Sequence, residues 1–267
     1  MILDEILRHK KAEVAARRAQ ESLVALRTRA EAMPPPRAFA SALQHKHVTL
    51  IAEIKRASPS RGTIKAETDV AQTAHTYADN GASAISVLTD SKYFRGDPND
   101  LQLARASTNV PILRKDFIVD EYQIFESCVL SADAILLIVR ALDDAQLRDY
   151  LLITHSLQMS ALVEIHNEDE LERSLKVNAH IIGINNRNLA DFTVDLATTE
   201  RLAPRIVSAV ERRDDKVIVA ESAIFTRADV ERVARVGADA VLVGEALMRA
   251  EKVPDKVREL ARVKRKA

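Results

Sequence analysis

The chain has 267 residues, of which 47% are apolar and 29% charged, and its 39 basic side chains balance its 39 acidic ones. This composition excludes a disordered chain. Zero net charge removes the long-range field that a nucleic-acid or anionic-membrane binder uses. The longest apolar run, residues 134–139, is far shorter than the ~20 residues of a membrane-spanning helix. We therefore expect no nucleic-acid and no membrane partner.

The N-terminal segment is expected to be helical. Apolar residues recur at helical spacing from Ile2 to Leu7, residues 12–32 are rich in good helix formers, and three prolines at 34–36 must break any helix. The first residues are charged and lack the apolar centre of a signal peptide. Cys128 is the only cysteine, which excludes an intrachain disulfide and suits a reducing compartment. These features predict a cytoplasmic protein.

From residue 50 onward, short apolar runs alternate with segments of helical periodicity. Eight such runs occupy residues 50–54, 84–88, 110–113, 134–139, 161–165, 181–184, 217–220 and 240–243. Most of them are apolar throughout, which is typical of strands buried on both faces. Helical patterns lie between the runs, at residues 69–80, 143–157, 167–177, 195–202 and 227–236.

The alternation of strands and helices indicates right-handed βαβ units and a parallel sheet. Eight units predict an α/β protein of one domain, a closed (β/α)₈ TIM barrel over residues 1–267, in which residues 1–47 form an N-terminal helical extension. A doubly wound open sheet is the alternative. It is less favoured, because no Gly-x-Gly-x-x-Gly follows the first strand.

Polar and charged side chains interrupt the apolar runs at the ends of five predicted strands. They are Glu53 and Lys55, Lys115, Glu164, Asn185 and Arg187, and Glu221 and Ser222. The carboxyl ends of barrel strands meet at one mouth. Desolvating charges there costs roughly several kcal/mol per ion, so the cluster is a poor way to stabilise a barrel. It suits an anionic substrate and proton transfer, although each residue taken alone is also compatible with a structural ion pair.

A phosphate site is suggested after the last two strands. Ser222-Ala223 and Gly244-Glu245 each begin a strand-to-helix turn, where barrels bind phosphate through backbone N–H groups. The alternative is that these are ordinary turns. Glu245 would also place a negative charge near the anion unless its side chain points away.

Other candidates carry weaker signals. His45 and His47 lack a further clustered ligand, so we expect an exposed loop and no metal. His166 lines the mouth or packs. Phe94 and Phe117 belong either to the core or to the walls of an aromatic-ligand pocket. Cys128, in an apolar helical segment, is expected to pack and not to act as a nucleophile.

Several of these motifs together resemble those of the indole-3-glycerol phosphate synthase family. The matching segments are 53–62 (EIKRASPSRG), 88–90 (LTD) with 93–96 (YFRG), 113–123 (LRKDFIVDEYQ), 183–189 (GINNRNL) and 221–224 (ESAI). Residues 2–17 also resemble the extra N-terminal helix of that family. The resemblance covers nearly the whole chain, and the first and third blocks are the most specific.

The resemblance implies a carboxy-lyase of tryptophan biosynthesis on a (β/α)₈ barrel. Its substrate is a phosphorylated aryl-amino sugar, 1-(2-carboxyphenylamino)-1-deoxyribulose 5-phosphate. The products are indole-3-glycerol phosphate, carbon dioxide and water. The dearomatised ring serves as its own electron sink, so no metal and no cofactor are expected. A monomer or weak oligomer is implied, and association with other enzymes of the pathway is compatible with the resemblance.

The resemblance also implies roles for single residues. Lys115 is the general acid for ring closure, and Glu164 is its partner carboxylate, as base or electrostatic stabiliser. Lys55 binds the substrate carboxylate, with a further role as an acid in dehydration, and Glu53 assists proton transfer and positions Lys55.

The remaining matched positions bind the sugar, the phosphate and the ring. Asn185 and Arg187 hold ribulose hydroxyls, while Glu221 and Ser222 shape the ribose and phosphate end. Ser58 and the backbone around Ala223, Gly244 and Glu245 form the phosphate cradle; Phe94, Phe117, Leu136 and Leu189 surround the aromatic ring.

Two positions depart from the family pattern. The family usually has Glu-Ser-Gly where this chain has Ala223, which resists the positive φ that glycine accepts. Glu245 stands where a small hydroxyl residue is frequent. A phosphosugar isomerase on the same barrel is the second enzyme hypothesis, although Lys55 and the Ser58-Pro59-Ser60 block favour the synthase. A phosphosugar-binding barrel without catalysis, supported only by Ala223, is the non-enzyme hypothesis.

Overall fold

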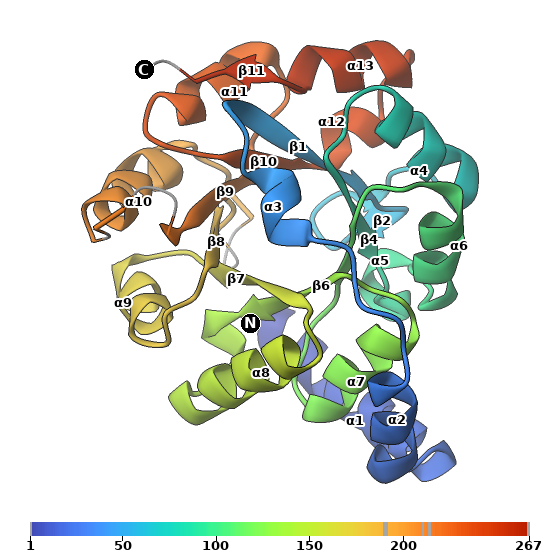
Figure 1. Cartoon of the computed structure of the whole chain (residues 1–267). Coiled ribbons are helices and arrows are strands. Elements are labelled where there is room, and N and C mark those ends of the chain that lie inside the picture. Colours follow the sequence, from blue (N-terminus) through green and yellow to red (C-terminus); the bar gives the residue numbers. More distant parts are fainter. Residues whose placement is uncertain (1, 189–191, 210, 213–214, 266–267) are drawn as a thin grey trace.

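A closed barrel of eight parallel strands forms the centre of the molecule (Figure 1). The computed structural model describes residues 2–188, 192–209, 211–212 and 215–265. The strands are β1 (His47–Ile54), β4 (Ala84–Leu88), β5 (Ile112–Lys115), β6 (Ala134–Ile138), β7 (Ser160–Ile165), β8 (Ile181–Asn185), β9 (Val217–Glu221) and β10 (Ala240–Val243). The barrel closes where β10 pairs with β1, from Thr49 opposite Ala240 to Ala52 opposite Val243. The (β/α)₈ prediction is confirmed, and the doubly wound open sheet is wrong.

The boundaries of three strands differ from the sequence prediction in ways that matter for the site. β5 begins at Ile112 and not at residue 110, because Pro111 has no N–H to donate to a neighbouring strand. It ends on Lys115 itself. Similarly, β8 ends on Asn185 and β9 on Glu221. The rigid hydrogen-bonded ladder therefore carries these polar side chains directly.

Helices cover the outside of the barrel. They are α4 (Val70–Asp79), α6 (Asn99–Ser107), α7 (Glu121–Val129), α8 (Asp144–Ser156), α9 (Glu168–Lys176), α10 (Ala197–Ser208), α11 (Arg227–Ala234) and α13 (Val253–Leu260), with the short α5 (Ser91–Phe94), η1 (Val139–Ala141) and α12 (Glu245–Met248). Asp69, Asp143 and Asn167 cap α4, α8 and α9 with their side-chain oxygens, so these helices begin one residue after each predicted start.

One predicted helix end is wrong. The segment expected to end at residue 202 continues through Pro204 to Ser208. A proline inside a helix costs about 3 kcal/mol. Burial of Ala203 and Ile206 against the barrel offsets this cost, because both side chains are inaccessible to solvent.

The N-terminal segment contributes three helices, α1 (Ile2–Gln20), α2 (Leu23–Glu31) and α3 (Phe39–Leu43). The three prolines lie between α2 and α3, as expected. α3 closes the amino-terminal end of the barrel, because Phe39 and Leu43 are fully buried among the inward-facing strand residues. α1 instead lies over the other end, where the strands finish.

Among the elements that were not predicted are three short strands outside the barrel. A hairpin, β2 (Ala57–Ser58) and β3 (Gly62–Thr63), forms in the loop after β1. β11 (Val263–Lys264) pairs antiparallel with the start of β1 near the C-terminus. No helix among the described residues has both the length and the apolar content needed to cross a membrane.

Candidate active site

A cavity opens at the carboxyl-terminal mouth of the barrel and is lined by side chains from most of its strands. Fifteen of the sixteen predicted site residues line this one cavity: Glu53, Lys55, Ser58, Phe94, Lys115, Phe117, Leu136, Glu164, Asn185, Arg187, Glu221, Ser222, Ala223, Gly244 and Glu245. The remaining one, Leu189, lies outside the described residues. The charged groups are thus gathered in one place and not scattered over the surface.

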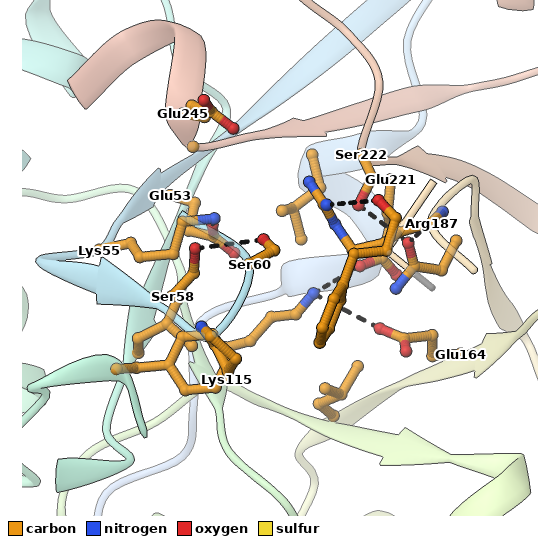
Figure 2. A pocket seen from close by; sticks show the side chains of 18 of the residues that line it. Glu53, Lys55, Ser58, Ser60, Lys115, Glu164, Arg187, Glu221, Ser222 and Glu245 are labelled. Carbon is orange, nitrogen blue, oxygen red and sulfur yellow. Dashed lines mark hydrogen bonds and ion pairs between the residues drawn. The ribbon is translucent and has the colours of Figure 1, made fainter. Parts of the chain in front are cut away.

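Lys115 lies at the centre of the charged cluster (Figure 2). Its Nζ atom is 2.5 Å from Glu221 Oε2 and 3.5 Å from Glu164 Oε2. The side chains of both carboxylates are at least 96% buried. The sequence had suggested Glu164 as the partner of Lys115, whereas the shorter contact is made by Glu221. β5, β7 and β9 supply the three groups, so closure of the barrel brings them together.

Burial and charge set different protonation states for these groups. Burial alone would lower the pKa of Lys115, but Glu221 and Glu164 outweigh it and raise the pKa above the ordinary value. Burial would raise the pKa of Glu164, yet Lys115 and His166 lower it. Burial raises the pKa of Glu221 to about 7, and repulsion from Glu164 adds to it against the attraction of Lys115. Lys115 and Glu164 are therefore charged at neutral pH, while Glu221 is poised to exchange a proton.

Glu53 and Lys55 form a second ion pair on the opposite side of the cavity. They point to the same face of the chain leaving β1, and Lys55 Nζ lies 2.5 Å from Glu53 Oε1. Although burial opposes it, Lys55 and then Lys115 hold the pKa of Glu53 below its usual value. Gly244 makes room for this pair, because a Cβ on it would lie 2.2 Å from Glu53 Oε1. Its lack of a side chain is thus a requirement of the site and not only of a turn.

Asn185, Ser222 and Arg187 form a polar network beside the carboxylates. Asn185 Oδ1 accepts hydrogen bonds from Ser222 Oγ at 2.9 Å and from the backbone N–H of Arg187 at 3.0 Å. The guanidinium of Arg187 donates to the carbonyl of Phe192 at 3.0 Å. These contacts orient the amide and the guanidinium in the cavity wall.

The turn after β9 adopts the conformation that its sequence disfavours. Ser222 has a φ of +65° and Ala223 a φ of +60°. For residues other than glycine the left-handed region costs roughly 1–2 kcal/mol. Ala223 is therefore strained in this turn, which lies at the cavity.

Glu245 begins α12 at the edge of the cavity and is neutralised locally. Its Oε1 atom lies 3.3 Å from the Nε atoms of both Arg61 and Arg249. Two guanidinium groups therefore compensate the negative charge that the sequence placed near the phosphate turn. Figure 2 shows this carboxylate at a distance from Lys115 and Glu164.

Apolar side chains form the remaining walls. The rings of Phe94 and Phe117 face each other with centroids 6.0 Å apart and a tilt of 40°. Leu136 joins them in lining the cavity and is itself buried. Phe94 and Phe117 thus line the cavity, and Phe117 also packs against the core. That they hold an aromatic ligand stays a prediction.

Helix α1 lines the cavity as well, which the sequence analysis missed. Ile2, Leu3 and Ile6 reach the cavity from α1. Lys10, fully buried on the same helix, lies 2.9 Å from both Asp90 and Asp116, which follow β4 and β5. The apolar spacing of this helix was visible in the sequence, but its position over the barrel mouth was not.

Two residues outside the predicted set of site residues also shape the site. Gly183 on β8 leaves space for Glu221, since a Cβ there would lie 2.1 Å from Glu221 Oε1. His166 follows β7 and contacts Glu164, with 3.4 Å between Nε2 and Oε1. In the sequence, only the separation of two residues between Glu164 and His166 indicated this contact.

The other candidates from the sequence lie away from the cavity. His45 and His47 stack on each other with centroids 5.1 Å apart. Among the described residues, no group of three or more acidic, histidine or cysteine side chains is placed to hold a metal ion. Cys128 is a free, buried thiol on α7 and packs in the core between the barrel and the helices.

Chemically, the cavity joins cations that can bind an anion, carboxylates of different pKa that can exchange protons, and an apolar wall that fits an aromatic ring. A solved structure of thiamine phosphate pyrophosphorylase from Pyrococcus furiosus matches 80% of this chain and 94% of its own length with a TM-score of 0.56. Since the sequences are only 18% identical, this likeness shows the fold alone.

Sequence comparisons are more specific. Indole-3-glycerol phosphate synthase from Roseiflexus sp. (strain RS-1) is 51% identical over 266 residues, and that from Roseiflexus castenholzii is 49% identical, each covering 97% of both chains. The protein named indole-3-glycerol phosphate synthase 2 from Ralstonia nicotianae is 43% identical over 98% of this chain and 97% of its own. The model of the indole-3-glycerol phosphate synthase family matches residues 3–260, and the chain belongs to that family.

Proposed function

We propose that this barrel closes the indole ring of indole-3-glycerol phosphate, with Lys115 as the proton donor. The observation that carries the proposal is the position of Lys115, between Glu221 and Glu164 in a cavity walled by Phe94 and Phe117. The family relationship supports the substrate, 1-(2-carboxyphenylamino)-1-deoxyribulose 5-phosphate. We assign its aromatic ring, carboxylate, sugar and phosphate to separate walls of the cavity.

Ring closure requires an acid. The ring carbon that bears the carboxylate attacks the ribulose ketone, and the carbonyl electrons move to oxygen. The developing alkoxide is a stronger base than an amine, so the ammonium of Lys115 can transfer its proton although its pKa is raised. Glu164 stays ionised beside it and stabilises the iminium charge that forms on the substrate.

Loss of carbon dioxide follows without an added electron sink. The carbon–carbon bond to the carboxylate breaks, and its electrons neutralise the iminium and restore the aromatic ring. Lys55 is assigned to the substrate carboxylate, and the ion pair with Glu53 keeps its side chain in the cavity. In the dehydration step Lys55 protonates the leaving hydroxyl and Glu164 accepts the proton that the ring gives up.

The polar end of the cavity is assigned to the sugar and the phosphate. Asn185 and Arg187 hold ribulose hydroxyls, while Glu221 and Ser222 shape the ribose end. The phosphate lies against Ser58 and the backbone N–H groups from Ala223 and from Gly244 to Glu245. The charge of Glu245 is taken up by Arg61 and Arg249, which supports this assignment.

Lys115→Met tests the mechanism. Product is followed by indole fluorescence, which is unobscured because the chain has no tryptophan. We expect wild-type protein to form product without added metal, and the variant to lose at least ~100-fold in kcat, as for other acid–base groups. Circular dichroism and thermal unfolding check that the variant is folded. Wild-type turnover by folded Lys115→Met protein would remove Lys115 from the mechanism.

Two broader expectations belong to the same proposal. We propose a cytoplasmic location, which the free thiol of Cys128 supports. We also propose a monomer or weak oligomer that can associate with other enzymes of tryptophan biosynthesis. Cell fractionation and sedimentation of the purified protein, alone and with those enzymes, test these statements.

A further inference from the structure

The proposed reaction has a proton balance that the residues assigned so far do not explain. The substrate enters with an ionised aryl carboxylate, and this group leaves as neutral carbon dioxide. The phosphate keeps its charge, and water and the indole product are neutral at the reacting atoms. Each turnover therefore takes up one proton from the solvent. A cavity in which Glu164 and Glu221 are almost completely buried needs a route for that proton.

His166 contacts Glu164, which lines the cavity, but His166 is not itself among the lining residues. Its Nε2 atom is 3.4 Å from Glu164 Oε1, while the other oxygen of Glu164 faces Lys115. Its Nδ1 atom lies 3.0 Å from Glu170 Oε2. Lys115, Glu164, His166 and Glu170 thus form a continuous line of groups that can hold or pass a proton.

The position of the imidazole ring is fixed by the start of α9. Glu170 Oε2 also accepts the backbone N–H of His166 at 2.8 Å. The side chain of Asn167 donates to Glu170 Oε1 at 3.1 Å and accepts the backbone N–H of Glu170 at 2.9 Å. The carboxylate of Glu170 therefore holds a proton on Nδ1, so that Nε2 is the nitrogen presented to Glu164. Nε2 is buried and makes no well-aligned hydrogen bond with any described residue.

A second pocket is lined in part by His166. It adjoins the catalytic cavity at Asn185 and Arg187, and every side chain that lines it is an arginine, asparagine, threonine, aspartate or His166 itself. Such a polar lining favours water over apolar ligands. His166 is therefore the group between the carboxylate that handles protons and a space suited to water.

The charges around the ring favour its protonated form. The charged groups that face it or line the adjoining pocket are Glu164 on β7, Glu170 on α9, Glu221 on β9, Arg140 in η1, Arg187 and Asp195 after β8, and Arg201 on α10. Burial lowers the pKa of His166, but Glu170 and Glu164 outweigh it and the pKa is raised. A protonated imidazole can therefore be present at the start of a turnover.

We propose that His166 is a proton relay that returns to Lys115, through Glu164 and from water in the second pocket, the proton that Lys115 gives up at ring closure. The imidazolium gives its Nε2 proton to Glu164 Oε1, and Glu164 passes a proton from Oε2 to Lys115. In the dehydration, the proton that Glu164 takes from the ring offsets the one that Lys55 gives to the leaving hydroxyl. The neutral ring keeps the proton on Nδ1, where it is hydrogen-bonded to Glu170, and regains a proton at Nε2 from water. Protons and charge balance, because the carboxylate leaves as neutral carbon dioxide and the proton taken from solvent accounts for its lost negative charge. The relay rests on the proposed synthase reaction.

His166→Gln tests the relay, because glutamine keeps a polar side chain but cannot titrate. We expect kcat to fall about 100-fold with KM changed less than about twofold, the solvent deuterium isotope effect on kcat to increase, and added imidazole to restore turnover. Glu170→Gln keeps the ring but removes its anionic partner, so the pH at which kcat declines on the alkaline side should move to lower values. His180→Gln is the matched control, since His180 lies at the opposite end of β8 and bonds to the Asp215 carbonyl.

The outcomes separate the relay from the reaction. If the wild-type protein forms no product in the same assay, the proposed function fails. If the wild-type protein turns over and folded His166→Gln protein has the same kcat, isotope effect and pH profile, only the relay is overturned. A loss of kcat that imidazole does not restore, with an unchanged isotope effect and an unshifted Glu170→Gln profile, assigns His166 a purely structural role and also overturns it.

Discussion

Three buried glutamates share one cavity with Lys115, yet they do not share a protonation behaviour. Glu53 and Glu164 have lowered pKa values because nearby cations outweigh the effect of burial. Glu221 makes the shortest contact with Lys115, but burial and the neighbouring carboxylates raise its pKa to about 7. Distance to a single partner therefore does not predict the charge of a buried group; the sum over all neighbours does.

The turn at Ala223 is strained, because this residue has a positive φ. We expect Ala223→Gly to increase the free energy of unfolding by about 0.5 to 1 kcal/mol, because release from the left-handed region outweighs the greater entropy of glycine in the unfolded chain. Urea unfolding at pH 7 measures the change.

The matched control is Ala16→Gly on the exposed side of α1, where glycine should destabilise by about 1 kcal/mol. If both substitutions lower stability equally, the turn at Ala223 carries no relievable strain.

Among the elements, α1 departs most from its expected role. The sequence predicts a helix that packs on the barrel, and the structure adds that its first turns line the cavity at the barrel mouth. Its buried Lys10 joins Asp90 and Asp116, and Asp116 directly follows Lys115 in the chain. The backbone N–H of Phe117 also donates to Asp116. α1 thereby holds the end of β5, and with it both the proposed acid and one wall of the cavity.

Lys10→Met should lower the free energy of unfolding by about 3 to 5 kcal/mol, because it leaves buried carboxylates without their shared cation. Burial opposes ionisation of Asp116, but Arg114 and Lys10 lower its pKa to about 2. This folded-state shift contributes stability above the unfolded pKa of about 3.8, and the contribution is lost as the pH falls through 2. Part of it should disappear in the variant.

Urea unfolding at pH 7 and pH 3 checks this expectation. Lys11→Met is the control, since Lys11 is exposed on the same helix and its change should stay within about 0.5 kcal/mol. Equal stabilities of the two variants would show that α1 is not anchored through Lys10.

At the scale of the whole molecule, net charge and local charge differ. The chain is neutral, and its cavity is lined by three cations and five carboxylates. Asp116 and Glu245 are paired with cations outside the lining. This leaves Lys55, Lys115 and Arg187 against Glu53, Glu164 and Glu221. An anionic ligand is therefore favoured when one carboxylate is protonated. The raised pKa of Glu221, about 7, makes it the group that can take up this proton.

We expect the affinity for indole-3-glycerol phosphate to weaken as the pH rises from 6 to 8, relative to the affinity of Glu221→Gln. Glu221 gains its negative charge over this range, whereas glutamine remains neutral. Titration of the ligand phosphate is common to both proteins, so it cancels in the ratio of their Kd values. Fluorescence titration of the indole gives both constants. A ratio that does not change with pH would assign the proton uptake to another group.

The sequence by itself determined the eight strands and most of the site residues. Buried parallel strands need unbroken apolar runs, and a barrel brings their carboxyl ends to one mouth, so residues such as Lys115 and Glu221 could be grouped without coordinates. The family resemblance, now supported by the family model over residues 3–260, supplied the reaction. The roles assigned to individual residues remain proposals.

Tertiary structure alone decided which groups pair and which are protonated. It brought Glu221, and not Glu164, closest to Lys115, put Ala223 in a left-handed turn, and laid α1 across the cavity. It also set His166 behind Glu164. These outcomes depend on distances and burial between segments far apart in the chain. Electrostatic energies change steeply with both quantities, and a linear pattern of residue types fixes neither.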